Sequence, residues 1–324
     1  SGVTYHPFGP VAGWTFGNGR TLSSGVDLNY NITSVIDSGA GGISYRYAYD
    51  AAGNMVELRD GSNNLLRSYE YDGLNRLTKV KNASNIVLWN YVYDKTGNRT
   101  SITIASESSG GPGGPGPGNP TYDYATLNYS YESASHRLTS NNIDPRGYDG
   151  AGNTVSIGNP NSPGGARYAF VYDNMNRLSS VTKRNGSSVV YSYNGNGERV
   201  RRNVDGLNEY HLYSMGKLVG IFDSAGNPIQ RMVWMGETPV GLLVGSSTPK
   251  MHYIEADILD TPRVVIDPVR NVSVWKWELE GEAFGNAFPV SDPDLDGTQF
   301  TLDMRYPGQV YDSFSGFTYN YFRD

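Results

Sequence analysis

Four aspartates in one short segment have a spacing that could hold a metal ion. Asp292, Asp294 and Asp296 alternate along the chain, a glycine follows them, and Asp303 takes the twelfth position counted from Asp292. Calcium binds several oxygens around a sharp turn, and this spacing of carboxylates and glycine is that of a calcium loop. Because Asp303 is one methylene shorter than the usual Glu, Pro293 stiffens the start and no helix is evident before it, a plain acidic turn is the alternative.

Other side chains give little chemistry. The histidines lie far apart, with no spacing typical of metal ligands: His6, His136, His211 and His252. The glycine-rich stretches lack the strand-to-helix setting of a phosphate loop, and no Ser-His-Asp arrangement follows from order alone. Calcium aside, the sequence predicts no cofactor.

A recurring sequence unit must position the functional residues of the chain. The pattern Tyr-x-Tyr-Asp, followed by a Gly-Asn or Asn-Arg step, has its second tyrosine at Tyr49, Tyr71 and Tyr93, a period of 22 residues. Related units surround residues 131, 148, 172, 193 and 213. Fixed self-similarity of this kind predicts a repeat architecture, in which each unit covers its neighbour.

The residues of the unit predict a hairpin. Tyrosines two residues apart lie on one face of an extended strand. Asp, Gly and Asn then end the strand, because Gly and Asn accept positive φ and the Asp carboxylate can bond backbone N–H groups two residues on. Rows of such rings pack between hairpins or stack on sugars, and we favour packing.

Two regions depart from the clear repeat. Residues 1–44 carry a drifted version, with a Gly-Asn-Gly turn after Trp14 and Phe16 and a new strand expected to begin at residues 28–31. Residues 106–120 are rich in Gly, Pro and Ser, which cannot pack and which remove ladder donors, so we expect a mobile surface loop. The same repeat resumes beyond it.

Composition favours an all-β protein and excludes several classes. The chain has 324 residues with 40 Gly, 25 Tyr and 38% hydrophobic residues, which suits a turn-rich β protein. Its net charge of −6 argues against nucleic-acid binding, and no apolar run is long enough for a membrane-spanning helix. No secretory signal is visible, and the absence of cysteine excludes disulfides and thiolate metal sites.

The units resemble the YD repeats of Rhs proteins, of the C component of insecticidal Tc toxins and of teneurins. The tail favours the bacterial Rhs type: residues 252–263 resemble its Asp-His-Leu-Gly-Thr-Pro-Arg segment, with departures at Ile258 and Asp260. Further similar motifs lie at residues 275–278, 283–285, 305–312 and 316–324. The resemblance implies an all-β antiparallel hairpin spiral with little helix, forming a shell.

The resemblance also implies a function. Rhs and Tc C proteins enclose a toxic C-terminal domain in a hollow β-shell, often delivered by a type VI secretion apparatus, and their core ends in an aspartyl autoprotease. Arg323 and Asp324 match the Arg-Asp pair of that protease, but its second Asp is not in this chain. Since aspartyl chemistry needs two carboxylates sharing a proton, we expect no enzyme activity.

These observations predict a YD-repeat spiral over residues 1–235 and a continuous Rhs core segment over residues 236–324. The expected role is a structural shell segment of a secreted bacterial toxin, with an enclosed toxin domain or a secretion component as partner, self-assembly as a further option, and no nucleic acid or membrane span. The alternatives are a cell-surface adhesion module that binds carbohydrate or protein, and a truncated aspartyl autoprotease.

Overall fold

The structure is a computed structural model that describes residues 2–107, 122–159, 161–163 and 165–321. Antiparallel strands joined by tight turns make up the fold, and the described residues contain no helix, so none of them could cross a membrane as one. This confirms the all-β hairpin prediction. The chain divides into two compact units, which we call the central unit (Tyr45–Arg146 and Glu280–Asn286) and the main unit (Ser1–Ser44, Gly147–Leu279 and Ala287–Asp324).

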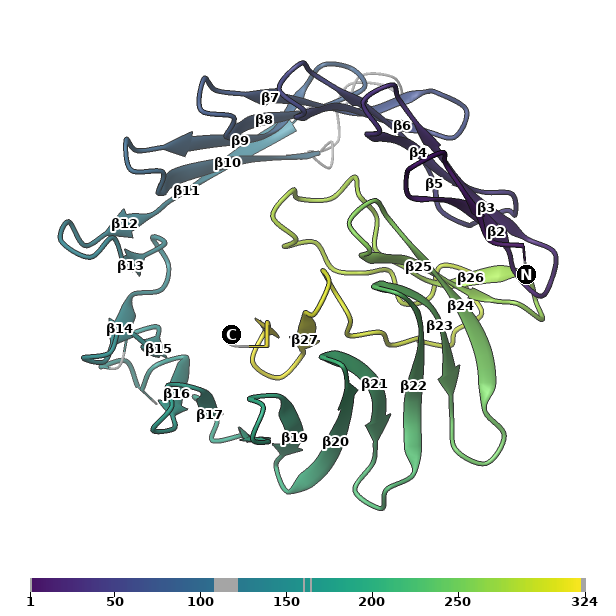
Figure 1. The fold of residues 1–324 in the computed structure, drawn as a ribbon. Helices are drawn as coiled ribbons and strands as arrows, with labels where there is room; N and C mark the ends of the chain where they lie inside the picture. Colours follow the sequence, from purple (N-terminus) through teal and green to yellow (C-terminus); the bar gives the residue numbers. More distant parts are fainter. Residues whose placement is uncertain (1, 108–121, 160, 164, 322–324) are drawn as a thin grey trace, which may run out of the picture. The chain divides into compact units, whose positions relative to one another are not determined.

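In the central unit, strands pair with their neighbours in chain order from β5 to β11, and β12 pairs with β13 (Figure 1). In β7 and β8, Tyr69 lies opposite Val80, Tyr71 lies opposite Leu77, and the register shifts between Glu70 and Tyr71. The same shift precedes the second tyrosine of other units. The strands are β5 (Ser44–Tyr49), β6 (Met55–Asp60), β7 (Leu65–Tyr71), β8 (Leu77–Asn82), β9 (Val87–Tyr93), β10 (Arg99–Glu107), β11 (Tyr122–Asn128), β12 (Ser130–Tyr131) and β13 (Leu138–Ser140).

The core of the central unit forms where alternate residues of β8, β9 and β10 face inward. Val80, Tyr91 and Ile102 are at most 4% exposed. A loop from much later in the sequence covers this face: the Tyr91 hydroxyl donates to Glu282 at 2.8 Å, and the Tyr91 ring meets the Phe284 ring edge-on at 5.1 Å between centroids. Residues 280–286 therefore belong to this unit, although the sequence places them in the tail.

In the main unit, thirteen strands from β14 to β26 also pair in chain order, and Figure 1 draws them from teal to green. Strands β1 to β4 form consecutive hairpins at the start of the chain. The strands are β1 (Thr4–Tyr5), β2 (Val11–Thr15), β3 (Thr21–Val26), β4 (Ile32–Asp37), β14 (Arg146–Tyr148), β15 (Thr154–Ile157), β16 (Tyr168–Tyr172), β17 (Leu178–Lys183), β18 (Ser188–Tyr193), β19 (Arg199–Val204), β20 (Leu207–Ser214), β21 (Lys217–Phe222), β22 (Pro228–Met235), β23 (Thr238–Val244), β24 (Lys250–Ala256), β25 (Pro262–Asp267), β26 (Val272–Lys276), β27 (Val310–Asp312) and β28 (Phe317–Tyr319).

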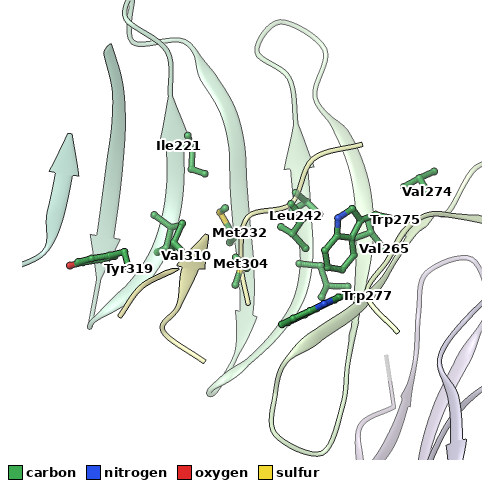
Figure 2. Packing of buried hydrophobic residues seen from close by; sticks show 13 residues of the cluster. Ile221, Met232, Leu242, Val265, Val274, Trp275, Trp277, Met304, Val310 and Tyr319 are labelled. Atoms are coloured by element: carbon green, nitrogen blue, oxygen red, sulfur yellow. The ribbon is translucent and has the colours of Figure 1, made fainter. Parts of the chain in front are cut away.

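Residues 300–321, which we call the C-terminal segment, cover one face of the large sheet. Figure 2 shows Met304, Val310 and Tyr319 of this segment against Met232 and neighbouring side chains of the sheet. A second cluster joins the segment to β16–β18, where the rings of Phe317 and Phe170 stack at 5.1 Å. The apolar face of the sheet is therefore buried by the tail of the same chain.

One region differs from its predicted structure. Residues 28–31 do not begin a strand: Asp27 accepts the N–H groups of Asn29 and Asn31 and makes a turn, so that β4 starts at Ile32. The Gly- and Pro-rich stretch lies mostly outside the described residues, and the division at residues 235 and 236 stays a prediction.

Candidate functional site: the contacts that join successive hairpins

The aspartate of each unit builds the turn after its strand. Asp94 Oδ1 accepts the N–H groups of Thr96 and Asn98, both at 2.9 Å, and Oδ2 accepts the Asn98 side-chain amide at 2.9 Å. Gly97 has a φ of 92°, which favours glycine. The side-chain hydrogen bonds from Thr96 and Asn98 lower the pKa of Asp94 to about 2. The predicted bond to the residue two positions on is confirmed; the bonds to the residue four positions on were not predicted.

The same turn recurs throughout both units, with either Asn or Arg as the side chain that returns to the carboxylate. In each case the carboxylate accepts N–H groups from residues further along the turn. The aspartates are Asp27, Asp50, Asp60, Asp72, Asp149, Asp173, Asp223 and Asp257.

In five of the units, the second tyrosine joins its hairpin to the preceding one. The Tyr93 hydroxyl donates to the carbonyl of Leu77 at 2.8 Å, and Leu77 is the first residue after the preceding turn. We call this series of bonds the tyrosine ladder. Its other members are Tyr71 to Met55, Tyr131 to Arg99, Tyr172 to Thr154 and Tyr193 to Leu178, with the Trp234 indole N–H to Leu218 as a variant.

The ladder explains why the tyrosine pattern survives the Gly- and Pro-rich insertion. Tyr131 follows that stretch, yet its hydroxyl still reaches the carbonyl of Arg99, which precedes it, at 2.8 Å. A phenol has an apolar ring for the core and one donor at its tip. Tyrosine therefore packs between hairpins and also satisfies a backbone carbonyl at the end of the neighbouring strand.

The two turn types have complementary roles. In an Asn-Arg turn, the Arg76 guanidinium binds Asp72 and lies over the ring of Tyr93 in the next hairpin, 4.8 Å from its centroid. In a Gly-Asn turn, the Asn54 amide donates to Asn75 of the next turn at 3.0 Å. The same contacts recur later in the chain: the Arg177 guanidinium lies over the Tyr193 ring, and the Asn153 amide donates to Asn176. Because the two turn types alternate, side-chain contacts connect each of these turns to the next hairpin.

The C-terminal segment enters the ladder at one position. The Tyr319 hydroxyl accepts the N–H of Arg199 at 2.9 Å and donates to the carbonyl of Gly197 at 3.3 Å. The Arg199 guanidinium lies between two rings, 4.7 Å from the centroid of Tyr191 and 4.3 Å from that of Tyr319. Within the described part of the chain, the Tyr213 hydroxyl has no hydrogen-bond partner. Tyr319 of the C-terminal segment therefore makes hydrogen bonds to the backbone of Gly197 and Arg199, whereas the Tyr213 hydroxyl makes none within the described residues.

A buried carboxylate fixes the same segment from its other end. Asp312 is 2% exposed and accepts the Tyr191 hydroxyl at 2.6 Å and the Arg202 guanidinium at 3.2 Å. Burial alone would favour the neutral acid, but Arg202 and the Tyr191 hydroxyl hold the pKa of Asp312 below its usual value. Charge pairing and ring packing together hold residues 312–319 on β18 and β19.

The aspartates of the predicted calcium loop are only partly brought together. The side chains of Asp292, Asp294 and Asp296 each offer an oxygen within 4.8 Å of the others, and Asp303 does not join this group. The Arg270 guanidinium contacts Asp294 at 2.7 Å and Asp296 at 2.5 Å, a cation that the sequence reasoning missed. Hard carboxylate oxygens fit calcium, so calcium binding by these three residues stays a prediction.

Asp303 is instead half-buried in the C-terminal segment, where Arg305 and Glu209 act on its charge. Burial raises its pKa to about 6, the positive charge of Arg305 opposes this rise, and the negative charge of Glu209 adds to it. The other predicted site residues, Arg323 and Asp324, lie outside the described residues, so their role and the expected lack of enzyme activity also stay predictions.

The histidines take part in local hydrogen bonds. His211 contacts Glu209 at 2.9 Å, His6 contacts the carbonyl of Ser24 at 3.0 Å, and His252 contacts the carbonyl of Lys250 at 3.3 Å. The only group of three or more metal-binding side chains among the described residues is that of the three aspartates. We therefore take the contacts of the ladder tyrosines, and not a metal cluster, as the candidate functional site.

Comparison with known proteins bears on the repeat. Residues 27–65, 71–108 and 148–188 match the family model of the RHS repeat. No curated protein sequence matches the chain. Among solved structures, a TcdB2–TccC3–TEV crystal structure is similar at 16% identity and a TM-score of 0.46, over 98% of this chain and 20% of that chain. The Tc holotoxin pore of Photorhabdus luminescens is similar at 16% identity and a TM-score of 0.39, over 99% of this chain and 19% of that one.

This chain thus spans about a fifth of the length of those solved chains. The matched residues carry the aspartate turns other than those of Asp223 and Asp257, together with the ladder tyrosines Tyr71, Tyr93 and Tyr172. Three stretches of this chain are therefore RHS repeats, and the resemblance to Rhs and YD-repeat proteins is confirmed.

Proposed function

We propose that this chain is a wall segment of a shell that encloses a toxic C-terminal domain of a bacterial Rhs-type toxin. The observation that carries the proposal is the tyrosine ladder, which at five positions joins successive hairpins by a side-chain bond in addition to the strand ladder. A wall built this way resists opening between hairpins, because separating two of them leaves buried polar groups without partners.

The mechanism in this proposal is steric. A closed wall of antiparallel sheets denies an enclosed chain the volume that folding needs and keeps proteases away from it. The ladder, the aspartate turns and the C-terminal segment supply rigidity, and no group of the wall needs to react with the cargo. Secretion from a bacterial cell and contact with a secretion apparatus belong to the same proposal.

Limited proteolysis of the full-length gene product tests the enclosure. We expect the toxic domain to resist cleavage while the shell is intact. Replacing ladder tyrosines by phenylalanine at Tyr71, Tyr93 and Tyr193 should increase cleavage of that domain, whereas Tyr124→Phe, on an exposed position of β11, should not. Equal cleavage of the toxic domain inside the protein and as a separate fragment would refute the proposal.

A second function, the binding of a carbohydrate or protein partner, is favoured by one observation. A cavity of about 270 Å³ in the main unit is lined in part by Tyr172, Tyr193, Tyr319 and Tyr321. Tyrosine rings that line a cavity can stack on sugars. Glycan-array binding that is lost in Tyr172→Ala, with circular dichroism unchanged, would support this function; an array without any binding would exclude the carbohydrate part.

A further inference from the structure

Three charged side chains from distant parts of the sequence meet inside the main unit. Arg20 precedes β3, Asp37 ends β4 and Glu255 lies in β24, and their side chains are 3%, 0% and 0% exposed. Arg20 Nε donates to Asp37 Oδ2 at 2.6 Å, and the Arg20 guanidinium also bonds Asn271 Oδ1 at 2.9 Å. Glu255 Oε2 accepts the N–H of Ile43 at 2.6 Å.

The charges of this group do not balance if both acids are ionised. One guanidinium would then face two carboxylates in a site closed to water, where an unpaired charge is costly. Asp37 takes the close contacts with Arg20, while Glu255 Oε1 stands 3.9 Å from Arg20 Nε and accepts no hydrogen bond from the described residues.

A proton on Glu255 resolves both problems. The Glu255 and Asp37 carboxyls both face the Arg20 guanidinium in one buried site, and two carboxyl oxygens can hydrogen-bond to each other only when a proton lies between them. With that proton the group is neutral, and Glu255 donates to Asp37 while it accepts from Ile43. Arg20 and Asp37 are the ionisable groups placed against Glu255; Asp257, two residues on, pairs with Arg263 instead.

The surrounding backbone is shaped to hold the group. A Cβ atom on Gly39 would lie 2.2 Å from Arg20 Cζ, and one on Gly42 would lie 2.1 Å from Asp37 Oδ2, so a side chain at either position would displace the charged group beside it. Close by, the Phe16 ring stacks on the Tyr253 ring at 4.5 Å. The group is therefore the polar centre of the contact between the N-terminal hairpins and β24.

We propose that Arg20, Asp37 and Glu255 form a clasp that is closed by one shared proton, and that its loss in alkali releases β2–β4 from β24. Burial first, and then the hydrogen bond and negative charge of Asp37, raise the pKa of Glu255 from 4.5 to about 9. A folded-state pKa above the unfolded value means that the stabilisation is complete in acid, declines as pH rises from about 4.5, and is lost once pH passes about 9.

Infrared spectroscopy at pH 8 tests the proton directly in the unmodified protein. We expect the carbonyl stretch of a protonated carboxyl, which disappears reversibly as the pH is raised beyond 9. Asp303 is ionised at pH 8 and does not contribute. Glu255→Gln should remove the band, and Glu57→Gln, a partly exposed control, should keep it. A wild-type spectrum without this band at pH 8 would overturn the proposal.

Unfolding measured between pH 6 and pH 8.5 tests the consequence. For the wild type, the clasp should lower the folding equilibrium constant by roughly tenfold per pH unit. Glu255→Gln keeps a donor toward Asp37 and an acceptor toward Ile43 but cannot ionise, so its pH dependence should be weaker by that factor. Limited proteolysis of residues 2–44 at pH 10 should be faster for the wild type than for Glu255→Gln. Identical pH dependence or equal cleavage would contradict the clasp.

Discussion

Removing a single ladder hydroxyl should have a measurable cost. In Tyr93→Phe, the ring stays packed against the core of the central unit and remains beneath the Arg76 guanidinium, whose Cζ lies 4.8 Å from the ring centroid. The lost group is the hydroxyl that donates to the carbonyl of Leu77 at 2.8 Å. A net hydrogen bond contributes about 1 kcal/mol, and a carbonyl left without its donor costs about 1–3 kcal/mol. We expect unfolding free energy to fall by about 1–2 kcal/mol.

Urea unfolding followed by circular dichroism measures this loss. The matched control is Tyr124→Phe in the same unit, because Tyr124 is 58% exposed and its change should stay within about 0.5 kcal/mol. Tyr93→Leu should cost more than Tyr93→Phe, because it also removes the ring beneath the guanidinium of Arg76. A Tyr93→Phe variant no less stable than the Tyr124→Phe control would refute the ladder as a stabilising contact.

Three further predictions concern charged groups. Asp94→Asn should fold normally, because Asn194 accepts the equivalent N–H groups in its own turn, whereas Asp94→Ala should destabilise the turn. The Asp94 pKa of about 2 means that the contribution of the ionised carboxylate is present above pH 3.8 and is lost as pH falls toward 2. Acid unfolding of Asp94→Asn should therefore start at a lower pH than that of the wild type. Asp303→Asn should leave the unfolding free energy unchanged at pH 4 and raise it by up to about 3 kcal/mol at pH 8, because the folded-state pKa of Asp303 lies near 6 and its unfolded-state pKa near 3.8. Thermal melts at both pH values measure this difference, and an equal effect of the substitution at pH 4 and pH 8 would contradict it. Arg270→Gln should strengthen calcium binding at Asp292, Asp294 and Asp296, because calcium no longer competes with the guanidinium, and a melting temperature of this variant that is insensitive to both calcium and chelator would eliminate the site.

Local chemistry made the hairpins predictable. Tyrosines two residues apart, followed by Asp and then Gly-Asn or Asn-Arg, specify a strand and its turn within about ten residues, and the 22-residue period shows that the units are equivalent. The bond from Tyr93 to Leu77 crosses to the neighbouring hairpin, and its acceptor is a backbone carbonyl, which leaves no mark in the side-chain pattern. The separation of 16 residues that recurs between Tyr71 and Met55 and between Tyr93 and Leu77 is the signal that could have revealed it.

Contacts between distant segments were not predictable. Nothing in residues 252–263 distinguishes Glu255 from a surface acid, because its burial depends on Arg20 and Asp37 more than 200 residues earlier. The calcium spacing suggested that Asp303 joins Asp292, but the chain after Gly297 continues into the buried C-terminal segment and takes Asp303 with it. Arg270 was missed for the same reason: its place beside the aspartates follows from tertiary packing.

Cryo-electron microscopy of the full-length gene product tests enclosure most directly. If these repeats form part of a closed wall, density for the toxic domain will lie inside the shell, and the hydroxyls of Tyr71, Tyr93 and Tyr193 will reach the carbonyls of Met55, Leu77 and Leu178 along that wall. A toxic domain folded outside the sheets, in contact with bulk solvent, would contradict the account.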